Sequence, residues 1–120
     1  MRSRLVGAAT VVLFGMLGTQ ATAMRRPITQ ADSGRTIHLA RGDQMTFRLS
    51  NRWRWSEPRA TTKAIELTPV EYFVNPGFRE WQIEGRALGR ATLRALGAPR
   101  CADCKLAARR FSVTIVVDAP

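Results

Sequence analysis

Alternation of apolar and polar residues dominates the chain from about residue 36 to the C-terminus. It is clearest over residues 111–117, where Phe, Val, Ile and Val occupy every second position. A period of two is typical of a half-buried β-strand, and the 3.6-residue period of an amphipathic helix is nearly absent. We therefore expect an all-β domain with strands near residues 36–40, 45–50, 62–68, 71–74, 81–83, 91–96 and 111–117.

Turn residues separate these apolar runs. Gly42-Asp43, Asn75-Pro76-Gly77 and Leu88-Gly89-Arg90 combine residues that preset or permit the backbone angles of a turn. Seven short strands with turns at this spacing predict an immunoglobulin-like antiparallel β-sandwich, in which two sheets bury alternate residues between them. We place this domain at residues 35–118, and we expect residues 24–34, which have little pattern, to form a flexible N-terminal arm.

The first 23 residues have the features of a secretory signal peptide. Arg2 and Arg4 precede an apolar run of about thirteen residues from Leu5 to Leu17, and Ala21-Thr22-Ala23 places small residues where a signal peptidase cuts. A run of this length is short for a bilayer span, which needs roughly 20 residues. We therefore expect cleavage after Ala23 and a secreted, soluble mature chain, residues 24–120, with no transmembrane segment.

The mature chain carries a marked excess of positive charge. Lysine and arginine total 19 in the full chain and 17 without Arg2 and Arg4, against nine acids, so the expected net charge is +8. The cations are dispersed, which is typical of solvated faces that keep a small secreted protein soluble. The alternative is attraction to a protein partner with acidic groups, to lipid headgroups or to an anionic polymer of the cell envelope. We expect no nucleic-acid partner, because the sequence contains no nucleic-acid-binding motif.

The two cysteines, Cys101 and Cys104, predict a disulfide bond. An even number of cysteines in an exported chain is typical of disulfide pairing. A ring this short would stabilise the fold by about 2 kcal/mol through loop closure. Cys-x-x-Cys also occurs in thioredoxin-like redox motifs and in zinc sites, but the redox motif opens a helix after a strand. A zinc ion would need two further ligands, and His38 is the only histidine in the chain.

The sequence predicts that the protein is not an enzyme. His38 lies on the strand face opposite Ile37 and Leu39, away from any candidate partner residue. Glu80 and Glu84 share a strand face but lie about 13 Å apart, beyond the separation of a glycosidase pair. The sequence has no glycine-rich phosphate loop, metal-ligand cluster or nucleophile elbow. We therefore expect no catalytic activity, no cofactor and no metal.

Arg52-Trp53-Arg54-Trp55 is the segment most suggestive of binding. In an extended chain both tryptophans lie on one face and both arginines on the other. One indole can fill the centre of an Ig-like core, whereas Trp and Arg on a loop are common interface anchors. The two interpretations are compatible if Trp55 is buried and Trp53 lies near the rim, which is the arrangement we expect.

Three segments carry a family resemblance: "IHLARGDQMTFRLSNRWRW", "IEGRALGRATLRALGAP" and "RRFSVTIVV". In this order they resemble the chagasin-like inhibitors of cysteine peptidases, which are Ig-like sandwiches. They are more similar to the small exported Ig-like proteins of actinobacteria that end in a cysteine-containing hairpin and a V-T-V-V-like strand. The resemblance covers about residues 35–118 and rests on strand and turn residues such as Gly42, Trp55 and Gly89. It implies the same sandwich, with Trp55 as the core tryptophan.

The working motifs of those inhibitors are mostly replaced in this chain. The family places Asn-Pro-Thr-Thr-Gly before the core tryptophan, where only Asn51 matches, and Arg-Pro-Trp before the last strand, where Ala98-Pro99-Arg100 stands. Inhibition by the family works through loops inserted into the cleft of a papain-like peptidase. Because most of the loop residues differ, we expect no tight inhibition of papain-like enzymes.

We expect partner binding at one end of the sandwich. In an Ig-like topology the connections over residues 50–60 and 97–109 lie at the same end. The expected partner-binding residues are Arg52, Trp53, Arg54, Pro99 and Arg100. The predicted function is therefore an exported, non-enzymatic binding module for a macromolecular partner. The alternatives are a chagasin-like cysteine-peptidase inhibitor and a basic envelope protein that binds anionic polymers.

Overall fold

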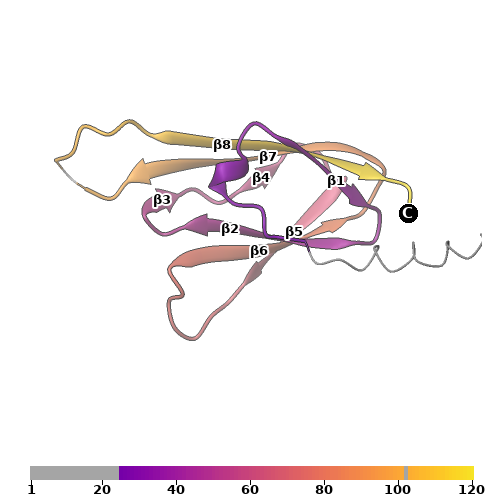
Figure 1. The fold of residues 1–120 in the computed structure, drawn as a ribbon, viewed down its shortest axis with the longest axis horizontal. Coiled ribbons are helices and arrows are strands. Elements are labelled where there is room, and N and C mark those ends of the chain that lie inside the picture. The colour runs from indigo at the N-terminus through magenta and orange to yellow at the C-terminus, as the bar shows by residue number, and fades with distance from the viewer. Residues whose placement is uncertain (1–24, 102) are drawn as a thin grey trace, which may run out of the picture.

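The computed structural model describes residues 25–101 and 103–120, which form two β-sheets packed face to face (Figure 1). The strands are β1 (Thr36–Ala40), β2 (Gln44–Ser50), β3 (Trp53–Trp55), β4 (Arg59–Ala60), β5 (Ile65–Val70), β6 (Phe78–Gly85), β7 (Gly89–Pro99) and β8 (Arg109–Asp118). The expected signal peptide, residues 1–23, lies outside the described residues. Within the described ranges, no helix is long and apolar enough to cross a membrane.

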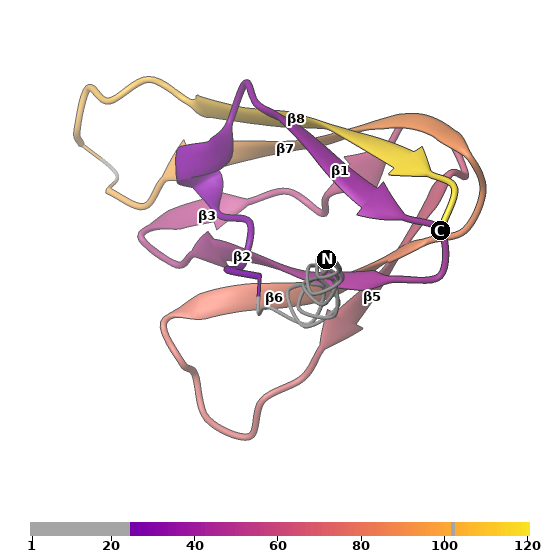
Figure 2. The same cartoon turned by 45° about the vertical axis from the view of Figure 1, so that its right-hand side comes forward.

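The two sheets confirm the Ig-like β-sandwich predicted from the sequence. One sheet has five strands in the order β1-β8-β7-β3, with β4 also paired to β7, and the other has the order β2-β6-β5. The β1–β8 pair is parallel and the other pairs are antiparallel, so the sandwich is not antiparallel throughout. Figure 2 shows that β7 and β8 form a long hairpin that projects beyond the other strands at one end.

An aromatic cluster joins the two sheets at the centre of the core. Phe47 on β2 stacks on Phe111 of β8 with ring centroids 5.1 Å apart, and it lies 5.2 Å from the ring of Trp81 on β6. The three side chains are at most 2% exposed. Aromatic pairs of this kind contribute about 0.5–1.5 kcal/mol beyond their buried area. Alternation along the strands therefore directs these three side chains into one shared core.

Three of the expected elements differ in the structure. The connection expected over residues 50–60 contains β3 and β4, which both pair with β7. The short strand predicted at residues 71–74 is absent, because residues 71–77 form a loop. The third strand was expected to end at Pro69 but continues through it to Val70. β5 is an edge strand, and an edge strand tolerates proline because one of its sides takes part in no ladder.

Residues 28–35 close one side of the sandwich and do not form the flexible arm that the sequence predicted. Ile28 is 2% exposed, its N–H donates to the carbonyl of Thr46 at 2.9 Å, and its carbonyl accepts from the N–H of Arg48 at 2.8 Å. Farther along, the N–H of Gly34 donates to the carbonyl of Ser112 at 2.7 Å in the other sheet. The segment thus connects β2 of one sheet to β8 of the other. A single buried apolar residue has no period, so the sequence pattern did not reveal it.

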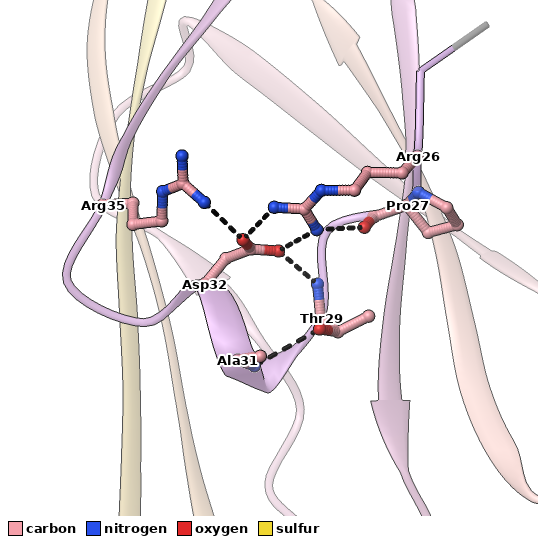
Figure 3. A network of polar contacts seen from close by, with 6 residues as sticks. All are labelled: Arg26, Pro27, Thr29, Ala31, Asp32 and Arg35. Atoms are coloured by element: carbon pink, nitrogen blue, oxygen red, sulfur yellow. Dashed lines mark hydrogen bonds and ion pairs between the residues drawn. The ribbon is translucent and has the colours of Figure 1, made fainter.

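Asp32 holds this segment in place (Figure 3). Its carboxylate caps a short 3-10 helix, η2 (Gln30–Asp32), by accepting from the N–H of Thr29 at 3.0 Å. Arg26 donates to both carboxylate oxygens, at 2.6 Å and 3.0 Å, and Arg35 donates to Oδ1 at 3.3 Å. Hydrogen bonding from Arg26 lowers the pKa of Asp32 from its ordinary value, against the opposing effect of burial. The carboxylate is 2% exposed, so it is a buried charge with its partners in place.

We predict that Asp32 makes stability sensitive to acid. A carboxyl whose pKa is lower in the folded state stabilises the protein above its unfolded pKa of about 3.9, and this contribution is lost as the pH falls through the folded pKa. Asp32→Asn should lower the free energy of unfolding at pH 7 by about 1–3 kcal/mol. Urea unfolding at a series of pH values should show a weaker acid dependence in D32N than in the wild type. An unchanged acid dependence, matching that of the control Asp43→Asn, would contradict the assignment.

Trp55 packs against Gly97, its cross-strand partner in the β3–β7 pair. The indole is 6% exposed, and its Nε1–H donates to the carbonyl of Ser50 at 2.9 Å. A Cβ atom at Gly97 would lie 2.8 Å from Cζ3 of the indole, so the ring occupies the space of the missing side chain. Trp53 is half-buried at the edge of the core. The prediction of a buried Trp55 and a Trp53 near the rim is confirmed.

Substitutions at these positions should follow a clear order. Trp55→Ala should lower the free energy of unfolding by about 3–5 kcal/mol, because it leaves a large cavity. Gly97→Ala should cost about 1–3 kcal/mol through overpacking against the indole. Trp53→Ala should cost less than Trp55→Ala. Chemical unfolding monitored by circular dichroism gives the comparison, and a larger cost for Trp53→Ala would reverse the assigned faces.

Candidate binding surface

Three connections lie at the same end of the sandwich, on the side where the β7–β8 hairpin projects (Figure 2). Cross-strand register places them together, since Ser50 lies opposite Phe78 and Trp53 lies opposite Pro99. We call this surface the three-loop end, and it comprises residues 51–52 between β2 and β3, 71–77 between β5 and β6, and 100–101 and 103–108 between β7 and β8.

Asn51 binds the first loop to both of the others. Its side-chain Nδ2 donates to Oδ1 of Asn75 at 2.9 Å, and its N–H donates to the carbonyl of Gly77 at 2.9 Å. On the other side, Nε of Arg100 donates to the carbonyl of Asn51 at 2.6 Å. The N–H of Gly77 closes the Asn-Pro-Gly turn by donating to Oδ1 of Asn75 at 2.8 Å. These bonds make the three loops one connected surface.

The loop over residues 71–77 has a fixed base. The Tyr72 hydroxyl donates to Oε1 of Glu80 at 2.8 Å, and the same oxygen accepts from Nε of Arg48 at 2.8 Å. Glu80 is 8% exposed, and its hydrogen bond to Tyr72 raises the pKa of the tyrosine. The Tyr72 ring also meets Phe78 edge to face, with centroids 5.9 Å apart. Polar and aromatic contacts therefore hold this loop against the three-stranded sheet.

The tip of that loop exposes apolar side chains. Phe73 is fully exposed and Val74 is 76% exposed. Large apolar groups on a fixed loop are typical of contact sites for other proteins. Their exposure was not predicted from the sequence, because Tyr72 and Val74 at alternate positions have the pattern of a strand. The available signal was an apolar run placed directly before a strong turn sequence, Asn75-Pro76-Gly77.

A recess of about 300 Å³ lies beside Asn51 between the first and third loops. Its lining residues are Arg52, Trp53, Pro99, Arg100, Cys101 and Leu106. The guanidinium of Arg109 covers the Trp53 ring at 5.2 Å from the ring centroid, a cation–π contact that fixes the indole at the rim. The recess therefore combines an aromatic ring and an apolar side chain with two exposed arginines.

Four of the five predicted partner-binding residues meet in this recess, and the fifth lies elsewhere. Arg52, Trp53, Pro99 and Arg100 line it together, although they come from segments more than 45 positions apart. Arg54 is exposed in the middle of β3, between two residues that face the core. Because side chains alternate along a strand, Arg54 points to the outer face of the five-stranded sheet and away from the three-loop end.

The structure pairs Cys101 with Cys104, as the sequence predicted. The bond lies within the third loop, and Cys101 contributes to the wall of the recess. It joins no two strands of the sandwich. The bridge therefore shapes the candidate binding surface and lies outside the core.

Of the remaining candidates for chemistry, His38 lies away from the three-loop end, whereas Glu80 lies at the base of its second loop. His38 is exposed on β1 near the opposite end, with Nδ1 2.8 Å from Oδ2 of Asp118. Glu80 is engaged by Tyr72 and Arg48. Among the described residues, no group of three or more His, Cys, Asp or Glu side chains has the arrangement to hold a metal ion.

The fold is similar to that of a solved cysteine protease inhibitor from Entamoeba histolytica. The two structures have a TM-score of 0.59 at 17% sequence identity, over 77% of this chain and 93% of the inhibitor. The solution structure of amebosin is also similar, with a TM-score of 0.47 at 16% identity, over 80% of this chain and all of amebosin. No protein-family model and no curated protein sequence matches the chain. At 17% identity, the similarity to the Entamoeba histolytica inhibitor shows the fold, and it confirms the chagasin-like sandwich expected from the sequence.

Removal of the disulfide should have a small effect on stability. Replacing Cys101 and Cys104 with Ser should lower the melting temperature by a few degrees, consistent with a loss of at most about 2 kcal/mol. Differential scanning calorimetry of the double variant against the oxidised wild type tests this. A loss of more than 4 kcal/mol (about twice the loop-closure estimate) would show that the core depends on the bond directly.

Proposed function

We propose that this protein is a non-enzymatic Ig-like module that binds a partner protein through its three-loop end. The observation that carries the proposal is the set of hydrogen bonds that Asn51 forms with both neighbouring loops, as donor to the second and as acceptor from Arg100 of the third. A surface whose loops are already fixed loses little conformational freedom when a partner binds, so more of the contact energy appears as affinity. The signal-peptide features of residues 1–23 support action outside the cytoplasm.

The composition of the surface supports a protein partner. Aromatic residues and arginine are enriched at the energetically dominant positions of protein interfaces. Phe73 offers an exposed ring on one loop, and Trp53 offers a half-buried ring in the recess of the other two. Arg52 and Arg100 flank the recess and favour a partner with acidic groups beside an apolar contact.

Inhibition of a papain-like cysteine protease is a second candidate. It is favoured by the fold shared with the Entamoeba histolytica inhibitor and by the presence of three fixed loops at one end. In chagasin-like inhibitors such loops enter the protease cleft, and Asn51 is the residue of the first inhibitor loop motif that this chain retains. The other motif residues are replaced, so the expected inhibition of papain is weak.

Loop variants should lose the partner without losing the fold. With the wild type immobilised in a source extract, we expect capture of a defined protein that persists at 0.5 M salt. Arg52→Ala with Arg100→Ala, and separately Phe73→Ala, should reduce capture at least tenfold and leave the melting temperature nearly unchanged. The matched controls at the opposite end are Arg41→Ala with Lys63→Ala, and Leu88→Ala.

The outcomes separate the candidates. Equal capture by the loop variants and the controls would contradict binding at the three-loop end. Inhibition of papain with a nanomolar constant, relieved by Phe73→Ala, would identify the partner class as papain-like proteases. Capture that disappears at high salt for every variant would point to general charge attraction.

A further inference from the structure

The outer face of the five-stranded sheet is covered by unpaired arginines. Side chains along β7 and β8 alternate between the core and this face, as their burial shows. The arginines on the outer face are Arg54 on β3, Arg59 on β4, Arg90 and Arg94 on β7, and Arg110 on β8. Among the described residues, none of the five forms an ion pair.

Four acidic residues bind arginines outside this face. Arg48 binds Glu80, and Arg86 binds both Glu66 and Glu84, on the three-stranded sheet or at its end. Asp32 is bound by the N-terminal segment. None of these ion pairs involves the five arginines of the outer face, so that face carries a local excess of positive charge.

Three of these arginines surround a groove of about 830 Å³. Arg59 lies directly opposite Arg94 in the β4–β7 register, and like charges in this position destabilise a sheet. Arg110 is diagonal to Arg94, since Arg94 lies opposite Ser112 on β8. Glu57 also lines the groove, but its carboxylate binds Arg79. The exposed Leu96 provides an apolar patch between the cations.

We propose that this groove binds the phosphate or sulfate groups of a linear anionic polymer. Guanidinium groups bind such oxyanions through two parallel hydrogen bonds, and a bound anion would relieve the repulsion between Arg59 and Arg94. Arg90 lies four residues from Arg94 along β7, and Arg54 pairs with Ala98, four residues beyond it. The arginines therefore extend over about 26 Å, which exceeds one oxyanion and fits a chain of repeated charges.

Titration calorimetry on the mature chain at 150 mM NaCl tests the site. The ligands are inorganic polyphosphate and dextran sulfate. Arg59→Gln with Arg94→Gln should weaken binding of the preferred polymer at least tenfold. Arg41→Gln with Lys63→Gln removes the same charge away from this face and should change affinity less than threefold. Tighter binding of polyphosphate assigns the site to phosphate polymers, and tighter binding of dextran sulfate assigns it to sulfated ones.

A single charge reversal separates binding from folding. Arg94→Glu places a carboxylate opposite Arg59, so it should raise the melting temperature while it weakens polymer binding at least tenfold. The proposal is overturned if both double variants lose affinity equally, if the wild type binds neither polymer, or if it binds only vesicles of anionic lipid. The Phe73→Ala variant should bind the polymer as the wild type does, so this site and the three-loop end can fail independently.

Discussion

The packing of Trp55 over Gly97 is the contact on which the shape of the three-loop end depends. The indole fills the space above a residue with no side chain, which lets β3 pair closely with the end of β7. Its hydrogen bond to the carbonyl of Ser50 connects this corner to the end of β2 in the other sheet. Asn51 follows directly, and its position between the other two loops is therefore set by a buried contact. A core residue in this way determines the shape of an exposed surface.

The two candidate surfaces come from two different consequences of the β-structure. Chain reversals at one end bring distant segments together, so Arg52 and Arg100 become neighbours in the three-loop end. Alternation along the strands separates residues that are adjacent in sequence, so Arg54 leaves that surface and joins the arginine face. One basic segment thus supplies both surfaces. A partner protein at the loops and a polyanion on the sheet would contact different faces, with no contact residue in common.

The sequence predicted those elements whose signal is local. Alternation at residues 111–117 predicted β8 correctly, because its inward face is apolar at every position. β3 was not predicted, because a three-residue strand has almost no period and its pairing depends on Gly97 far along the chain. Ile28 was missed for the same reason, since burial of a single residue leaves no pattern. The opposite error occurred at residues 71–74, where exposed apolar residues of a loop alternate as they would in a strand. Most of the predicted site residues meet in one recess because Ig-like connectivity fixes which loops share an end.

Site-specific photo-crosslinking tests the central claim, that the three-loop end is the contact surface, most directly. A benzoylphenylalanine at position 73, on the exposed tip of the second loop, is compared with one at position 88, an exposed leucine at the opposite end. After irradiation in a source extract, we expect one dominant protein adduct from position 73 and none from position 88. Equal labelling from both positions, or labelling from position 88 alone, would contradict it.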